Sequence, residues 1–236
     1  MTEATSLHFY ASPSQPCSYI PEQVSVSAFA DPADPITTLT YSTLIDHGFR
    51  RSGQHVYRPH CPSCTDCVSV RIPTSRFMPN KNQRRNFNKN QDLSVTMLPS
   101  GFRAEHYELY KTYMNSRHHD GEMANPEPDD YSRFLMCDWC NTRFIEFRLN
   151  QRLVAVAVID LLPQGFSSVY TFFSTEHDQR SLGRYAILWQ INECQRRQLN
   201  YVYLGFWIKD CQKMSYKTEY QPLEGLVDER WRRVSR

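Results

Sequence analysis

From about residue 94 onward, apolar positions recur at regular spacings that predict strands and helices in turn. The stretch "SVTML" predicts a short strand, and apolar side chains repeat at helical spacing between about Ala104 and Arg117. A second helix is expected to begin at Asp129 or Asp130, because an aspartate side chain can cap the first free backbone N–H groups of a helix. This part of the chain therefore has the pattern of an ordered α+β domain.

Three strands, a long helix and a further strand are predicted next. "TRFIEFRL" and "RLVAVAVIDLL" flank the turn residues Asn150 and Gln151, which indicates a β-hairpin, and "SSVYTFFST" follows the turn "PQG". A helix is expected from about Ser181 to Gln198, followed by the apolar strand "YVYLGFWI". The resulting order, β-α-α-β-β-β-α-β, resembles that of the GNAT acyltransferase fold. In that fold the last two core strands splay apart, and the acyl donor and the acceptor amine meet in the gap.

The first 93 residues have a different character. They are interrupted by prolines and contain short alternating stretches such as "HVYR" and "CVSVRI", with one predicted helix in "TTLTYSTLIDHGF" that stops at Gly48. We therefore predict a small N-terminal domain over residues 1–93, which carries a cysteine cluster and a basic segment. A GNAT-like domain with a mixed, mostly antiparallel sheet is predicted over residues 94–236.

Composition limits the classes of function. The net charge of +2 is too small to make the whole surface bind polyanions, so any nucleic-acid affinity must come from local charge. No stretch approaches the ~20 apolar residues needed to cross a bilayer, and the first residues lack the features of a signal peptide. We expect a cytoplasmic location with no membrane contact. In that reducing compartment the eight cysteines are expected to be metal ligands or thiols rather than four disulfides.

The sequence "HCPSCTDC" places Cys61, Cys64 and Cys67 at a strict three-residue spacing. Two thiolates at this spacing can reach the same metal ion at the ~2.3 Å typical of zinc–sulfur bonds. Cys17 or His60 could supply a fourth ligand. The alternative is that these are reduced cysteines in tight turns that bind nothing. Cys137 and Cys140 share the spacing but are expected to be buried.

A basic segment follows the cysteines directly. Aromatic and amide side chains are interleaved with its six cations, which are Arg71, Arg76, Lys81, Arg84, Arg85 and Lys89. Such a mixture can bind phosphates through charge and nucleotides through amides and aromatic faces. Because "KNQRRNFNK" contains no acidic side chain, an isolated surface helix there would repel itself. We therefore favour a polyanion site over a solvated helix face.

Several motifs spread over nearly the whole chain carry a family resemblance. "CSYIP", "YRPHCPSCTDCVSVRI", "FMPNKNQRR", "SVYTFF", "RSLGRYAILWQ", "YVYLGFWIKDC" and "KMSYK" resemble the bacterial leucyltransferases, relatives of the eukaryotic arginyl-tRNA-protein transferases. The resemblance implies transfer of leucine from leucyl-tRNA to the α-amine of proteins that begin with Asp or Glu, which marks them for degradation by the N-degron (N-end rule) pathway. It also implies an iron–sulfur cluster or zinc ion at Cys17, Cys61, Cys64 and Cys67, which would brace the small domain.

The implied chemistry is aminolysis of an ester, which needs a positioned amine, a base and a stabilised oxyanion, and requires no cofactor. Glu146 and Asp160 are the candidate bases, and Tyr170, Tyr203 and Tyr216 are candidate hydroxyl donors. Arg84 and Arg85 are candidates for binding tRNA. The acidic side chain of the acceptor needs a cation, for which Arg76, Arg180 and Lys217 are candidates. A leucine pocket could draw on Phe172, Trp189 and Trp207.

Three alternatives stay open on the residues alone. The transferred residue could be arginine, as in the arginyl-tRNA-protein transferases. A coenzyme A-dependent N-acetyltransferase fits the strand order, although Tyr185 in the turn "RSLGRY" stands where a small residue should let the backbone approach a pyrophosphate. A non-catalytic, metal-stabilised nucleic-acid-binding protein fits residues 60–90 but leaves the second half of the chain without a role.

Overall fold

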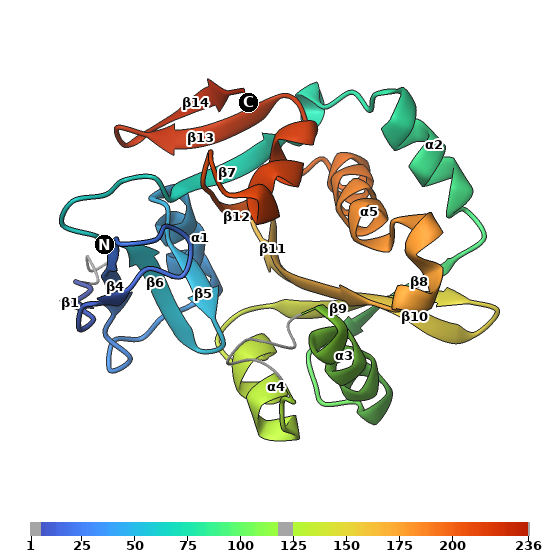
Figure 1. The fold of residues 1–236 in the computed structure, drawn as a ribbon, viewed down its shortest axis with the longest axis horizontal. Coiled ribbons are helices and arrows are strands. Elements are labelled where there is room, and N and C mark those ends of the chain that lie inside the picture. The colour runs from blue at the N-terminus through green and yellow to red at the C-terminus, as the bar shows by residue number, and fades with distance from the viewer. Residues whose placement is uncertain (1–5, 118–124, 236) are drawn as a thin grey trace, which may run out of the picture.

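The computed structural model describes residues 6–117 and 125–235, and within them two main sheets (Figure 1). The smaller, antiparallel sheet lies in the N-terminal part, where helix α1 (Thr38–Asp46) also lies. Its strands, in order, are β1 (Phe9–Ala11), β4 (Ser27–Ala30), β6 (His55–Pro59) and β5 (Arg50–Ser52). A two-stranded ribbon of β2 (Gln15–Pro16) and β3 (Val24–Ser25) flanks the segment that begins with Cys17.

The larger sheet forms the body of the protein. In spatial order its eight strands are β14 (Arg230–Val234), β13 (Leu223–Val227), β7 (Val68–Pro73), β12 (Tyr201–Trp207), β11 (Gly165–Phe173), β10 (Arg152–Leu162), β9 (Thr142–Leu149) and β8 (Ser94–Pro99). Within the described ranges, β11 and β12 are the one parallel pair of this sheet. The predicted α+β class with a mixed, mostly antiparallel sheet is confirmed.

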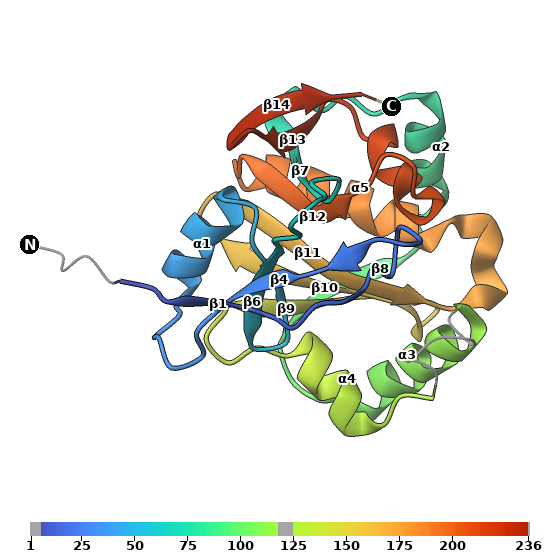
Figure 2. The same ribbon diagram turned by 60° about the vertical axis from the view of Figure 1, so that its left-hand side comes forward.

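Helices cover both faces of this sheet. Figures 1 and 2 show α3 (Ala104–Arg117) and α4 (Pro128–Leu135) on one side, and α2 (Lys81–Lys89) and α5 (Leu182–Arg196) on the other. Three 3₁₀ segments, η1 (Thr74–Arg76), η2 (Thr175–Arg180) and η3 (Gln212–Glu219), connect elements at the edges. Almost every side chain of β10 is buried, as expected for a central strand covered on both faces. None of the helices in the described ranges has both the length and the apolar character needed to cross a membrane.

The predicted order from β8 to β12 is confirmed, and the hairpin turn falls at Asn150 and Gln151. Both residues have positive φ angles, 47° and 69°, as a tight two-residue hairpin turn requires. The predicted start of α4 is wrong by two to three residues. Glu127 is the N-cap and Pro128 is the first helical residue, while the Asp130 carboxylate accepts a hydrogen bond from the Glu127 N–H at 3.1 Å.

The course of β7 determines how the two halves of the chain meet. This strand leaves the cysteine loop and enters the large sheet between β12 and β13, and α2 then packs against α5. Both elements belong to the range predicted as the N-terminal domain, residues 1–93. The cysteine loop is therefore joined directly to the centre of the large sheet.

Candidate active site

The large sheet opens between β11 and β12. The two strands pair only from Gly165 to Ser167, opposite Tyr201 to Tyr203. Beyond that point β11 continues along β10, whereas β12 continues along β7. The result is a V-shaped gap between neighbouring strands, of the kind in which acyl donor and acceptor meet in the GNAT fold.

Both strands carry a bulge where the gap opens. In β11 the register with β10 shifts so that Val169 is the extra residue, and in β12 the register with β7 shifts at Leu204. Gly205, the next residue, has a φ of 79°, a conformation that favours glycine. Such bulges re-aim side chains and free backbone groups, and they are common next to active sites.

Arg50 of β5 reaches the mouth of the gap. Its Nη2 donates a hydrogen bond to the Ser168 carbonyl at 2.5 Å, beside the bulge of β11. Its guanidinium also lies against Gly205, since a Cβ built there would be 3.5 Å from Arg50 Nε. The residue is 6% exposed. Nothing in the sequence pattern singled out Arg50. Because Arg50 and Arg51 are neighbours in one strand, their side chains point to opposite faces of the sheet.

Lys217 lies on the β12 side of the gap. The residue is 7% exposed, and its Nζ donates a hydrogen bond to the carbonyl of Phe206, which follows Gly205. Burial, reinforced by the nearby guanidinium of Arg50, lowers the pKa of Lys217 to about 7. The side chain is therefore largely neutral at slightly alkaline pH, which suits an acceptor of protons better than a permanent cation.

Tyr216 and Tyr170 belong to the same region. Tyr216 is 42% exposed as a residue, but its hydroxyl end is buried, and burial raises its pKa to about 12. The Tyr170 hydroxyl donates to Met114 Sδ at 3.4 Å, and burial raises its pKa well above the usual range. Both groups are thus neutral hydrogen-bond donors across the physiological pH range. Tyr203 lies apart, because its hydroxyl is bound to Asp46 Oδ1 at 2.7 Å.

The structure places Glu146 in an ion-pair network between β9 and α3. Its carboxylate lies 2.7 Å from His106 Nε2 and accepts a hydrogen bond from Arg148 Nε at 2.7 Å, and Arg148 also pairs with Glu105. Burial alone would raise the pKa of Glu146, but the hydrogen bonds from Arg148 and His106 lower it. These contacts support a structural role and do not connect Glu146 to the gap.

Asp160 is likewise fully engaged within the fold. Its two carboxylate oxygens accept hydrogen bonds from Arg51 at 2.7 and 2.8 Å, and Thr142 Oγ1 donates to it at 2.8 Å. Both side chains of the Arg51–Asp160 pair are completely buried. The pair joins β5 of the small sheet to β10 of the large one, so it links the two sheets.

The cations predicted to bind the acceptor are separated. Arg76 pairs with Glu224 at the edge of the large sheet. Arg180 makes a bidentate pair with Asp92, at 2.8 Å for both hydrogen bonds. Of these predicted cations, only Lys217 lies beside the gap.

The predicted leucine-pocket residues are also divided. Phe172 packs in the core on the α3 side of the large sheet, whereas Trp207 and Trp189 pack in the core that includes α5. Trp207 is 7% exposed, and its Nε1–H is buried with no partner among the described residues.

Helix α2 presents the basic segment. It forms despite its like charges because Asn80 and Gln83 make a reciprocal capping box, at 3.0 and 2.9 Å, and because Phe87 packs on Tyr185 of α5. Arg84 and Arg85 are both exposed, and Arg84 Nη1 donates a hydrogen bond to the Pro79 carbonyl. The Lys89 amine donates to the Gln179 carbonyl at 2.7 Å, so the helix is anchored beside the start of α5.

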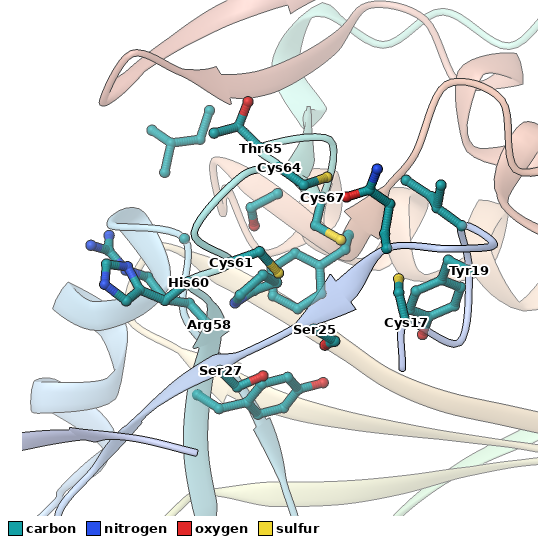
Figure 3. A pocket seen from close by; sticks show the side chains of 18 of the residues that line it. Cys17, Tyr19, Ser25, Ser27, Arg58, His60, Cys61, Cys64, Thr65 and Cys67 are labelled. Carbon is teal, nitrogen blue, oxygen red and sulfur yellow. The ribbon is translucent and has the colours of Figure 1, made fainter. Parts of the chain in front are cut away.

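The four cysteines predicted as metal ligands line one cavity of about 390 Å³ (Figure 3). Cys17 begins the connection between the two strands of the ribbon, while Cys61, Cys64 and Cys67 come from the loop that leads into β7. Burial, and then the neighbouring thiols, raises the pKa of Cys67 to about 11. In the described part of the chain, no group of three or more His, Cys, Asp or Glu side chains is set closely enough to hold a metal ion as it stands.

Comparison with protein families places this geometry in a known context. The N-terminal model of the arginine-tRNA-protein transferases matches residues 15–85, and their C-terminal model matches residues 105–227. The chain belongs to the arginine-tRNA-protein transferase family. The first match contains Arg50 and the four cysteines, and the second contains both strands of the gap, so the candidate active site of this transferase is assembled from both family regions.

Curated relatives within the transferase family are similar over almost their entire length. The chain is 52% identical over 231 residues to the aspartate/glutamate leucyltransferase of Pseudomonas putida F1, and 51% identical to that of Pseudomonas paraeruginosa PA7. Each alignment covers 98% of this chain and 98% of the relative.

Among solved structures, L-PGS from Bacillus licheniformis is similar to this transferase in fold. It matches with a TM-score of 0.51 at 10% sequence identity, over 67% of this chain and 58% of that one. At such low identity the likeness concerns the fold alone. It agrees with the strand order that resembles the GNAT fold.

Proposed function

We propose that this chain transfers leucine from leucyl-tRNA to the N-terminal α-amine of proteins that begin with aspartate or glutamate. The observation that carries the proposal is the identity of 52% over 98% of the chain with an aspartate/glutamate leucyltransferase. The structure supplies matching features: a splayed gap for the reacting groups and a basic helix, α2, that packs against α5. The name of the relatives favours leucine over arginine as the transferred residue.

The exposed face of α2 is the proposed path of the tRNA. Arg84 and Arg85 lie on that face, and α2 is anchored to the segment just before α5 through Lys89. Cations on a rigid helix can hold the phosphates of a tRNA acceptor stem. The leucyl ester at its 3′ end would then enter the gap between β11 and β12.

Lys217 is proposed as the base. It takes a proton from the α-ammonium group of the acceptor, and the neutral amine attacks the ester carbonyl carbon. A new C–N bond forms while the C–O bond to the terminal ribose breaks, and the second amine proton passes to the departing ribose oxygen. The hydroxyls of Tyr170 and Tyr216 stay protonated and can donate hydrogen bonds to the transient oxyanion. No oxidant or cofactor is needed for this step.

The function is tested by incubating the protein with purified leucyl-tRNA, arginyl-tRNA or acetyl-coenzyme A and a reporter peptide that begins with aspartate. Mass spectrometry is expected to show addition of leucine from leucyl-tRNA and no acetylation. A peptide that begins with alanine is the matched control and should stay unmodified. An acetylated product without leucine would contradict the proposal.

Replacement of the proposed base should remove the rise of kcat with pH that its deprotonation causes. Because only neutral Lys217 accepts a proton, wild-type kcat should rise with pH through about 7 and then level off. Lys217→Met should lower kcat by about 10²–10⁴-fold and abolish this rise. Lys213→Met, an exposed position in the same 3₁₀ segment, is the control. If Lys217→Met retained the wild-type pH profile, the base would have to be another group.

Removal of a cation from α2 should weaken tRNA binding in a salt-dependent manner. Each phosphate contact releases counterions, so Arg85→Ala and Arg84→Ala should flatten the slope of log K against log salt by roughly 0.7–0.9. Both should raise KM for leucyl-tRNA more than they lower kcat. Phosphate contacts remote from the ester stabilise the ground state and the transition state equally, so their loss weakens binding without slowing the chemical step. Arg133→Ala, on α4 across the sheet, should leave the slope unchanged. Unaltered slopes in both α2 variants would exclude this path.

We further infer that Cys17, Cys61, Cys64 and Cys67 bind a zinc ion or an iron–sulfur cluster. Four sulfurs around one cavity form a donor set that suits either group. Bound metal would hold the ribbon and the loop together and so fix the start of β7.

Protein purified without oxygen should therefore contain zinc or iron in stoichiometric amount, measured by elemental analysis. Cys64→Ser should lose the metal and lower the thermal midpoint of unfolding, because the loop loses its cross-link. Cys194→Ser is the control, since this buried thiol is remote from the cavity and its donation to the Tyr201 carbonyl can be kept by a hydroxyl. Metal-free protein with wild-type stability and activity would exclude the site.

A further inference from the structure

Arg50 is a buried guanidinium without a carboxylate partner. Charged side chains are almost never buried unless they are paired, because desolvation of a lone charge is costly. Yet Arg50 is 6% exposed and makes no ion pair within residues 6–117 and 125–235. Its Nη1 is buried and has no hydrogen-bond partner in that part of the chain. The missing partner is an acceptor of hydrogen bonds.

The next residue shows what a satisfied arginine looks like in the same strand. Arg51 is buried to the same degree, 6% exposed, but its guanidinium is matched by Asp160 and Thr142. Arg50 instead finds one backbone carbonyl, that of Ser168. The fold thus gives Arg51 a counter-charge and leaves Arg50 without one.

The position of Arg50 connects it to the reaction. Its guanidinium spans the gap mouth, between the bulge at Val169 and the glycine that follows Leu204. Its charge affects the pKa of three tyrosines and one lysine, none of which is a carboxylate: Tyr41, Tyr57, Tyr216 and Lys217. Its positive charge is therefore available to a ligand in the gap.

The other cations considered for the acceptor are less suitable. Arg76 and Arg180 already pair with Glu224 and Asp92. Lys217 is largely neutral when it acts as the base. A guanidinium remains charged at every accessible pH and can bind a carboxylate with directed N–H groups.

We propose that Arg50 binds the side-chain carboxylate of the N-terminal Asp or Glu of the acceptor and thereby determines acceptor specificity. This inference rests on the proposed function. The carboxylate would accept a hydrogen bond from the unused Nη1. A neutral amide at the same place would leave the cation buried without a counter-charge, so asparagine and glutamine are rejected.

The test compares two peptides that differ only in Asp or Asn at position 1. Arg50→Gln should lower kcat/KM for the Asp peptide on the order of 10²-fold, as loss of a hydrogen bond to a charged group implies. The value for the Asn peptide should not fall, so the preference for Asp collapses. The salt-dependent affinity for leucyl-tRNA should be unchanged. Arg133→Gln, an exposed arginine of α4, is the control with wild-type preference.

A pH profile provides a second readout. Because Arg50 is one cause of the lowered pKa of Lys217, the rise of kcat should move to higher pH in Arg50→Gln. If Arg50→Gln does not fold, Arg50→Lys takes its place. Its shorter, single ammonium group should still lower kcat/KM for the Asp peptide by roughly tenfold or more, without lowering that for the Asn peptide.

The possible failures are distinguishable. If wild-type protein forms no leucylated peptide, the proposed function is wrong. If wild-type protein is active but the variant keeps the wild-type Asp preference, the assignment of Arg50 is overturned. Equal losses for Asp and Asn peptides would also overturn it, because they would place Arg50 on the leucyl ester or in the support of the fold.

Discussion

A strand that leaves its neighbour inside a sheet must find another partner, because buried backbone N–H and C=O groups cannot stay unpaired. The opening between β11 and β12 depends on this requirement. As β12 departs from β11 it pairs with β7 along its whole length, from Tyr201 to Trp207. The N-terminal part of the chain thereby supplies the strand that lets the C-terminal part split.

The same arrangement explains the distribution of charge. Arginines at the edges and between the sheets are matched by acids, as in the Arg51–Asp160 and Arg148–Glu105 pairs. The gap is different, because its walls present backbone carbonyls, tyrosine hydroxyls and one amine around Arg50. A site that must receive both an anionic side chain and an amine needs positive potential together with a group that can lose its own charge. In the proposed mechanism, Arg50 provides the positive potential and Lys217 is the group that can lose its charge.

Much of the fold could be predicted from local pattern, and much of the site could not. Periodicity and turn residues gave the order of elements from β8 to β12. The cysteine spacing grouped Cys61, Cys64 and Cys67 but left Cys17 and His60 as alternatives for a fourth ligand, and both line the same cavity. Glu146 and Asp160 stood out as acids on strands, but their partners His106 and Arg51 lie 40 and 109 residues away. Pairing at such separations is set by sheet register and helix packing. For the same reason Arg50, which acts across 118 residues, left no local signal.

The place of β7 in the sheet also determines when the site can exist. Its partners β12 and β13 lie more than a hundred residues later in the chain, and the Arg71–Glu224 pair between β7 and β13 spans 153 residues. During synthesis β7 therefore emerges long before any strand that can pair with it, and contacts at such separation form slowly. Both strands that border the gap are therefore present beside Arg50 only when translation is nearly complete. A chain truncated before residue 201 consequently lacks β12, one of the two strands that form the gap.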